Sequence, residues 1–203
     1  MSDQKSIDAS VYRPLYGEPA DYVVEAHAPF MESTCQQFIR ACTLMVLSST
    51  NEAGYVDMSP RGGEPGFIHI LDERHIAFLD QPGNRKLHTI GNLAQRGQVG
   101  MLFIVPGVTE VLRAYGFATA NNDQQMIAQM GGHPSRNKSV LQIRIDKIFP
   151  HCSTALNKAN LWNQDRWPSE LAEAIPDIRG LGSSIASARK AAESADGDPP
   201  ENS

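Results

Sequence analysis

Two adjacent cations, Arg85 and Lys86, stand where one apolar run ends and another apolar pattern begins. The apolar residues between positions 87 and 93 recur at helical spacing, and Asn84 is a favourable residue for capping such a helix. A helix N-terminus presents unpaired N–H groups, and an arginine can grip a phosphate through two parallel hydrogen bonds. The segment therefore predicts either a phosphate site or an ordinary solvated turn, and its own spacing leaves both open.

A second polar cluster surrounds Pro60, a residue that blocks helix formation and favours extended backbone. Ser59 and Arg61 flank this proline, and three glycines follow in the segment 61–66, which is expected to be a loop. Residues without a side chain let a ligand or another chain come close to the backbone. The alternative is a flexible hairpin loop with no ligand.

A third cation, Arg113, lies in a strand pattern beside aromatic residues. A cation in such a position usually has an anionic partner, so the alternatives are a ligand, a pair with Glu110 or an exposed strand face. The later segment 151–162 adds Lys158 and Trp162, and it is interpreted as either part of a binding site or a packed helix.

Metal binding and several common catalytic arrangements have no support in the sequence. The six histidines are scattered, without the HxxH, HExxH or CxxC spacing of metal sites. A serine nucleophile elbow, a Walker loop and the GxGxxG dinucleotide fingerprint are also absent. No metal is predicted, and no residue is identified as a catalytic general base.

The composition is that of an ordinary globular protein with an acidic balance. The 203 residues carry a net charge of −5, which argues against a nucleic-acid partner but not against a small anionic ligand. No apolar stretch is long enough to span a bilayer, and residues 1–10 lack the apolar core of a signal peptide. Three cysteines form no disulfide framework, so the cytoplasm is the expected location and no membrane partner is expected.

The chain is expected to be mainly β, with six or seven short strands joined mostly as hairpins and a few peripheral helices. This pattern predicts an antiparallel barrel or sandwich. Helices are expected at 29–42, within 121–138 and at 183–193. The run 98–105 is apolar almost throughout, which is typical of a strand buried on both faces or covered by a partner subunit. The expected strands are 43–50, 55–60, a hairpin over 67–79, 98–105, 111–120 and 139–149.

Four segments, taken in order, closely resemble the pyridoxamine 5′-phosphate oxidase-like family, and more narrowly its flavin-nucleotide-binding branch. They are "DMSPRGGEPGF", "AFLDQPGNRKLHTIGNL", "VGMLFIVPGVTEVLRAYGFA" and "HCSTALNKANLW". The resemblance covers about 28–163 and implies an antiparallel split β-barrel that binds FMN between the subunits of a homodimer. Residues 1–27 are then an N-terminal lead, and 164–203 a C-terminal extension with a disordered acidic tail.

The resemblance also implies which residues contact the flavin. Residues 83–86 match the family's Gly-Ser-Arg-Lys phosphate loop, and 57–61 match the strand that lines the ribityl chain and flavin ring. Residues 79–80 match the adjacent strand, while 110–113 lie near a strand that contacts the flavin from the partner subunit. The candidate cofactor-binding residues are Asp57, Met58, Ser59, Pro60, Arg61, Leu79, Asp80, Asn84, Arg85, Lys86, Glu110, Arg113, Lys158 and Trp162.

The function implied by the resemblance is that of an FMN-dependent oxidoreductase whose reductant is a nicotinamide nucleotide or a small organic substrate. The alternatives are a non-catalytic flavin carrier or sensor, and a heme or deazaflavin binder on the same barrel. The oxidase itself ends in an Arg-x-His signature, which is absent near this C-terminus. Oxidation of pyridoxamine phosphate is therefore not expected.

Overall fold

The computed structural model describes residues 9–83, 85–168, 170 and 178–195. The chain divides into two compact units, Met1–Trp162 and Asn163–Ser203. The second unit contains a short 3₁₀ turn, Gln164–Arg166, and the helix α8, Ile178–Ala195, which is longer than the predicted helix at 183–193. The acidic end of the predicted disordered tail, residues 196–203, lies outside the described residues.

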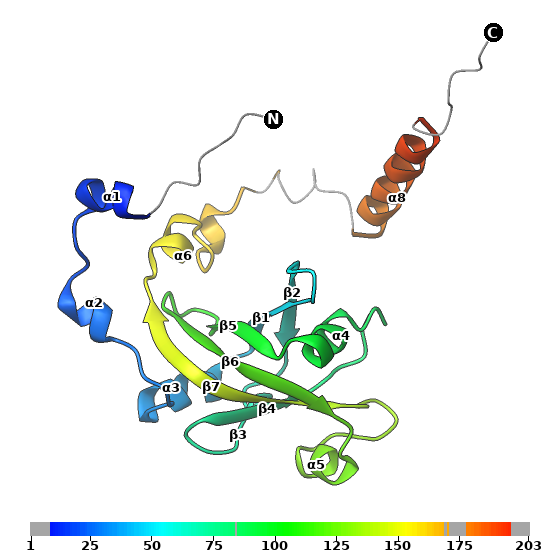
Figure 1. The fold of residues 1–203 in the computed structure, drawn as a ribbon, viewed down its shortest axis with the longest axis horizontal. Coiled ribbons are helices and arrows are strands. Elements are labelled where there is room, and N and C mark those ends of the chain that lie inside the picture. The colour runs from blue at the N-terminus through cyan, green and yellow to red at the C-terminus, as the bar shows by residue number, and fades with distance from the viewer. Residues whose placement is uncertain (1–8, 84, 169, 171–177, 196–203) are drawn as a thin grey trace. The chain divides into compact units, whose positions relative to one another are not determined.

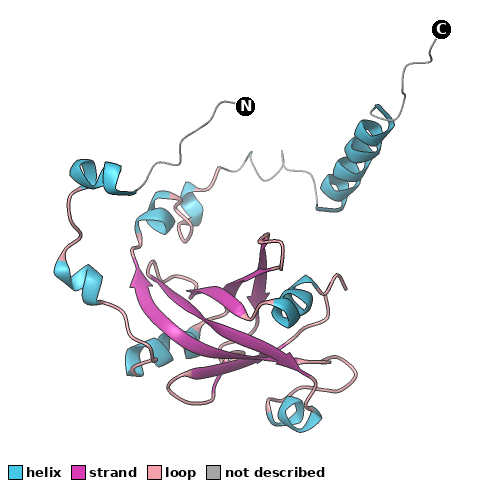
Figure 2. Cartoon of the chain, in the orientation of Figure 1, coloured by secondary structure: helices cyan, strands magenta, loops and turns pink. Residues whose placement is uncertain are grey.

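The first unit is built on one seven-stranded sheet whose strand pairs are all antiparallel (Figures 1 and 2). The strand order is β2-β1-β5-β6-β7-β4-β3, so β2 and β3 are edge strands and the sheet is not closed. The predicted mainly β fold of split-barrel type is thus confirmed. The strands are β1 Leu44–Thr50, β2 Val56–Gly62, β3 His69–Ile70, β4 His75–Leu79, β5 Gln98–Ile104, β6 Val111–Asn121 and β7 Val140–His151.

The alternating sequence of β7 explains which of its faces is buried. Leu141, Ile143 and Ile145 are buried as predicted, because successive side chains of a strand point to opposite faces. The pairing with β6 then shifts at Tyr115/Gly116, which makes a β-bulge, and the next fully buried residue is Ile148. The bulge lets the long β6–β7 hairpin curve, as Figure 1 shows.

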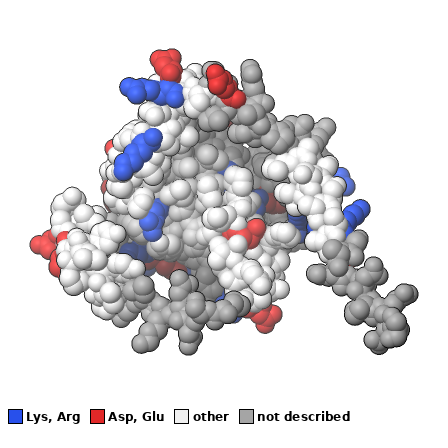
Figure 3. Space-filling view, turned by 90° about the horizontal axis from the view of Figure 1, so that it is seen from above, with Lys and Arg blue, Asp and Glu red and all other residues white. Residues whose placement is uncertain are grey.

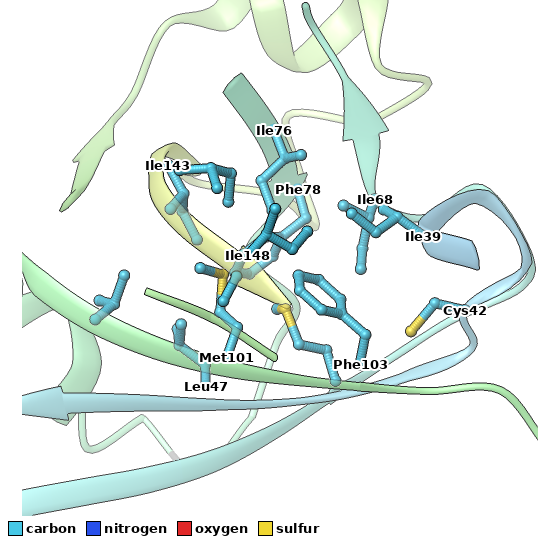
Figure 4. Packing of buried hydrophobic residues seen from close by; sticks show 14 of the residues in the cluster. Ile39, Cys42, Leu47, Ile68, Ile76, Phe78, Met101, Phe103, Ile143 and Ile148 are labelled. Carbon is cyan, nitrogen blue, oxygen red and sulfur yellow. The ribbon is translucent and has the colours of Figure 1, made fainter. Parts of the chain in front are cut away.

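The core lies on the concave side of the sheet, where side chains from β1, β4, β5 and β7 meet (Figure 4). The helix α3, Ser33–Ala41, contributes Ile39, and Cys42 follows at its end. Glu32 begins this helix by accepting hydrogen bonds from the backbone N–H groups of Thr34 and Cys35, at 2.9 and 2.7 Å. Each large buried side chain, such as Phe78 or Phe103, contributes about 1.5–3 kcal/mol to folding.

The remaining helices of the first unit are short. The N-terminal lead contains α1, Ala9–Tyr16, and α2, Asp21–Glu25. The helix α4, His88–Gln95, packs against β1, β2 and β6. Between β6 and β7 lies α5, Gln124–Gln129, and α6, Thr154–Lys158, follows β7. None of the helices described by the structure is long and apolar enough to cross a membrane.

Candidate functional site

A cavity of about 740 Å³ opens beside the edge strand β2. Its other walls are the end of β4, residues 81–83 and 85–90, and the loop 135–139 between α5 and β7. Nine of the predicted site residues line this one cavity, although they come from three separate parts of the sequence. They are Asp57, Met58, Ser59, Pro60, Arg61, Leu79, Asp80, Arg85 and Lys86.

The residues of β2 alternate between the two faces of the strand. Asp57, Ser59 and Arg61 are half-buried, whereas Met58 and Pro60 between them are exposed. The strand continues to Gly62, which pairs with Leu44, so the predicted loop at 61–66 was wrong at its first two residues. Because β2 pairs only with β1 among the described strands, its outer edge keeps backbone N–H and C=O groups without a strand partner.

Arg61 is fixed in place from two sides. Its Nη1 donates to Oδ1 of Asp80 at 2.8 Å, and its Nη2 donates to Oγ1 of Thr89 at 2.9 Å. The ion pair is mostly buried, with 17% of the Arg61 side chain and 21% of the Asp80 side chain exposed. The Nε atom of Arg61 is also buried but has no hydrogen-bond partner. The charge of Arg61 is therefore balanced by a carboxylate, while one of its donors stays unused.

The turn that carries the two adjacent cations has an unusual backbone. Arg85 and Leu87 both have positive φ angles, 62° and 56°, whereas Lys86 between them does not. Each such non-glycine residue costs about 1–2 kcal/mol, and successive amides in alternating conformations form a concavity that binds anions. Strain of this kind gathers at functional sites, so the turn favours a phosphate site over an ordinary surface turn.

The helix after this turn begins later than predicted. The helix α4 starts at His88, and its N-cap residue is Leu87. The prediction of Asn84 as the N-cap was therefore wrong. Asn84 itself lies outside the described residues. Leu87 is 63% exposed, Leu93 packs against the hydrophobic core, and the fully buried residues of α4 are Thr89 and Asn92. The Nδ2 of Asn92 donates to Oγ of Ser49 at 2.9 Å. Hydrogen bonds of Thr89 with Arg61 on β2 and of Asn92 with Ser49 on β1 thus hold the helix, whereas the apolar spacing had predicted a packing contact of Leu87.

The other four described candidates do not line this cavity. We define the outer patch as Glu110, Arg113, Tyr115, Phe149 and His151, on β6, β7 and the turn before β6. The guanidinium of Arg113 donates to the hydroxyl of Tyr115 at 2.6 Å, lies 3.2 Å from Nδ1 of His151 and stacks 4.8 Å from the ring centre of Phe149.

Beyond the outer patch, Trp162 donates from Nε1 to the carbonyl of Val108 at 2.9 Å. This contact fixes the chain after α6 against the turn before β6. Lys158 is exposed in the last turn of α6. In a single chain the predicted site residues thus form two groups, one in the cavity and one at the far ends of β6 and β7.

One loop that contributes four residues to the cavity wall was missed by sequence reasoning, and Thr89, which accepts a hydrogen bond from Arg61, was not among the candidates either. Ser135, Arg136, Lys138 and Ser139 come from the loop before β7, about 50 positions beyond the predicted phosphate turn. They reach the cavity because β7 pairs with β4, which places Val140 opposite Leu79. No periodicity or motif in the sequence signals that pairing. Among the described residues, no group of three or more His, Cys, Asp or Glu could hold a metal ion.

Comparison with known proteins identifies the family to which this fold belongs. The family model of pyridoxamine 5′-phosphate oxidase matches residues 31–152, and this chain belongs to that family. A comparison with curated protein sequences gives no significant match.

Several solved structures are similar to part of this chain at low sequence identity. HupZ from Group A Streptococcus is 15% identical with a TM-score of 0.45, over 57% of this chain and 91% of that one. General stress protein 26 from Bacillus anthracis is 14% identical with a TM-score of 0.43, over 57% and 88%. The FAD binding protein from Mycobacterium smegmatis is 12% identical with a TM-score of 0.40, over 61% and 97%.

Proposed function

We propose that this protein binds FMN in the cavity beside β2 and acts as an FMN-dependent oxidoreductase. The observation that carries the proposal is the turn at 85–87, where two left-handed residues place Arg85 and Lys86 on the wall of that cavity. One turn with two cations suits one phosphate group, as in FMN. The GxGxxG fingerprint that holds the pyrophosphate of a dinucleotide is absent from the sequence.

The other residues of the cavity fit the remainder of the cofactor. The unpaired edge of β2 offers the amide donors and acceptors that match the polar edge of a flavin ring. Asp57 and Ser59 can bond the hydroxyls of a ribityl chain, and the unused Nε of Arg61 can donate to a ligand oxygen. A volume of about 740 Å³ lies in the range of small-molecule sites. FMN, when bound, supplies the hydride or electron transfer, and the chain orients it.

The proposal includes a homodimer, because the outer patch does not reach the cavity of its own chain. On β5 only alternate residues are fully buried over 99–103, and Leu102 keeps a half-exposed side chain next to Arg113. A second copy packed on this face would cover it and bring Glu110, Arg113, Lys158 and Trp162 to the flavin of the partner. Such isologous contacts are the commonest way in which soluble proteins assemble.

The electron donor in this proposal is a nicotinamide nucleotide or a small organic substrate. Pyridoxamine phosphate is not proposed, because the Arg-x-His signature of the oxidase is absent near the C-terminus. Nucleic acid is not proposed either: the net charge is −5, and in Figure 3 the coloured Lys and Arg side chains are interspersed with Asp and Glu.

The test is the visible spectrum of the purified protein, followed by heat release and chromatography of the bound flavin. We expect FMN as the main species, and anaerobic loss of the yellow colour on addition of NADH or NADPH. An adenine-containing flavin, or no binding of added FMN, would overturn the proposal. Tight FMN binding without reduction by either nucleotide or by small organic donors would favour a flavin carrier or sensor over an enzyme.

A further inference from the structure

We propose that a second, smaller cavity, the α4 groove, binds the adenine base of a nucleotide. The groove has a volume of about 390 Å³ and lies between the turn at 51–53, after β1, and one face of α4. This volume is in the lower part of the range of small-molecule sites. The groove and the cavity beside β2 share Lys86, Leu87 and His88 in their linings. FMN contains no adenine, so this inference goes beyond the proposed function.

Hydrogen bonds fix both walls of the α4 groove. The backbone N–H of Glu52 donates to Oε1 of Gln95 at 2.9 Å, and Nη2 of Arg96 donates to the carbonyl of Glu52 at 3.0 Å. The bond from Asn92 to Ser49, at 2.9 Å, ties the same face of α4 to β1. The groove is therefore preformed, and little protein entropy is lost when a ligand binds.

Gly91 gives the first sign of a ligand. It lies inside α4, where glycine is less favourable than alanine, and its φ angle is not positive. A Cβ atom at this position would meet no protein atom within 4 Å, and the residue lines the groove. The contacts of the described chain thus give no reason for a glycine here. Its absent side chain leaves room for a ligand to approach the helix backbone.

Asn92 gives the second, independent sign. The residue is only 9% exposed, and its Oδ1 accepts no hydrogen bond within the described part of the chain. That oxygen is accessible rather than sealed inside the protein, and Asn92 lines the groove. Polar atoms of buried side chains nearly always have a partner, because an unsatisfied one destabilises the fold. A donor on a ligand would supply this partner.

Gln95 supplies a donor beside this acceptor. Its Oε1 accepts from Glu52, and its Nε2 keeps two hydrogens without a partner among the described residues. Asn92 and Gln95 are three positions apart on α4, so their side chains are neighbours on the helix surface. An acceptor next to a donor matches an amino group next to a ring nitrogen, which is the edge that adenine presents.

The rest of the groove suits a neutral planar ring better than an anion. Apart from the imidazole of His88, its ionisable residues are one cation, Lys86, and one carboxylate, Glu52. Leu87, 63% exposed, offers apolar contact to the face of a ring. Because Lys86 and Leu87 also line the cavity beside β2, a nucleotide whose base lies in the groove can extend towards the flavin.

The groove is tested by calorimetric titration of the FMN-loaded protein with adenosine and, separately, with inosine. The two probes differ at one purine position, where inosine has a carbonyl oxygen in place of the amino group. We expect adenosine to bind more tightly by roughly tenfold or more, because inosine would place an acceptor against Oδ1 of Asn92. Equal affinities, or no adenosine binding at concentrations of about 1 mM, would overturn the inference.

Gly91→Ala and Gly91→Phe form a matched pair of variants. Alanine is the better helix former, so the thermal unfolding midpoint should rise by roughly 2–4 °C, with adenosine affinity changed less than about threefold. Phenylalanine at the same position should fill the groove and abolish adenosine binding. Wild-type adenosine affinity in Gly91→Phe would overturn the inference. The comparison of adenosine with inosine needs no variant, so it decides the question even if Gly91→Phe does not fold.

Further measurements identify the source of the base and separate this inference from the proposed function. Adenosine that competes with NADH in the reduction of bound FMN would assign the base to the electron donor. Adenosine that binds without slowing the reduction would assign it to a separate adenine nucleotide. A protein that binds no FMN but still prefers adenosine to inosine would overturn the proposed function and support the α4 groove.

Discussion

Arg61 and Arg113 are both held on strands of the same sheet, but they differ in what surrounds their charge. Arg61 is balanced by Asp80, at 2.8 Å, inside the cavity. Arg113 contacts a phenol, a phenyl ring and an imidazole, and no carboxylate among the described residues. The Arg61 pair therefore belongs to a wall that is complete within one chain. In the outer patch, Arg113 has no ion-pair partner among the described residues, although the patch also carries Glu110, which accepts a hydrogen bond from Thr109.

The strand register explains why the two regions stay apart in one chain. Pro60 pairs with Val46, Val46 with Leu102, and Leu102 with Arg113, so β2 and β6 are separated by the whole width of β1 and β5. Neighbouring strands lie about 4.8 Å apart, which puts roughly 14 Å between β2 and β6. One flavin can contact both groups if the outer patch comes from a second chain.

The largest effect is expected in the cavity, from Arg85→Ala. A charge-assisted contact to phosphate contributes roughly 1.5–3 kcal/mol, so FMN binding should weaken by about ten- to a hundredfold. Fluorescence titration of the apo protein with FMN measures this directly. Lys86→Ala should weaken FMN binding less, because an ammonium is a hydrated point charge, whereas a guanidinium can donate two parallel hydrogen bonds to one phosphate.

The control for this prediction is Arg40→Ala, which removes a cation on the exposed face of α3, far along the sequence from the turn. Its FMN affinity should equal that of the wild type. If Arg85→Ala also binds FMN with wild-type affinity, the left-handed turn does not bind the phosphate. The cavity would then differ from the outer patch in its ion pair but not in a role in FMN binding.

A smaller effect is expected from Arg113→Ala in the outer patch. A cation at an aromatic face contributes about 0.5–2 kcal/mol, which corresponds to a loss of FMN affinity of roughly two- to thirtyfold. The informative measurement mixes the two variants. A dimer of one Arg85→Ala chain and one Arg113→Ala chain has one site with both defects and one intact site, provided the two arginines reach each flavin from different subunits.

With random exchange of subunits, about half of the dimers are mixed, so about a quarter of all sites should regain the affinity of the wild type. Light scattering on the same samples checks that they are dimeric. If mixing restores no tight sites, both arginines act within one chain or Arg113 does not contact the flavin. A monomeric mass at micromolar concentration would exclude the dimer altogether.

The strands could be predicted from the sequence, because their signals are local. The alternation over 139–149 identified the buried face of β7 up to Ile145, but the bulge that follows depends on the pairing with β6 and has no local signal. The start of α4 was misjudged for a similar reason. Asn84 satisfies the capping preference, yet contacts of Thr89 with Arg61 and of Asn92 with Ser49 fix the helix later in the chain.

The candidate site shows the same limit. The turn with Arg85 and Lys86 and the strand at 55–60 were recognised from short segments, and the resemblance supplied the expected flavin contacts of 57–61. The loop at 135–139 was missed, because only the antiparallel pairing of β4 with β7 brings it to the cavity. Pairing between distant strands is a property of the folded chain, so a wall built from such a loop becomes visible only in the structure.

The smallest effect concerns Cys152, which follows the outer patch directly. Hydrogen bonds from Thr154 lower the pKa of this exposed thiol. Burial raises the pKa of Cys35 to about 11 and also raises the pKa of Cys42. Because the thiolate is the reactive form, iodoacetamide near neutral pH should label Cys152 first, as peptide mass spectrometry would show. Thr154→Val should raise this pKa and slow the labelling by a few-fold, roughly.

Labelling of Cys152 also tests whether the outer patch contacts the flavin of a partner subunit. The cavity lining contains no cysteine among the described residues, so labelling of Cys152 changes only the neighbourhood of the outer patch. If that patch completes the flavin site of a partner subunit, labelling of Cys152 should be slower in the FMN-loaded dimer than in the apo protein. Fully labelled protein should then bind FMN roughly a few-fold more weakly than unlabelled protein. Labelling at the same rate with and without FMN, together with unchanged FMN affinity, would place the outer patch away from the flavin and leave the cavity beside β2 as a site made by one chain.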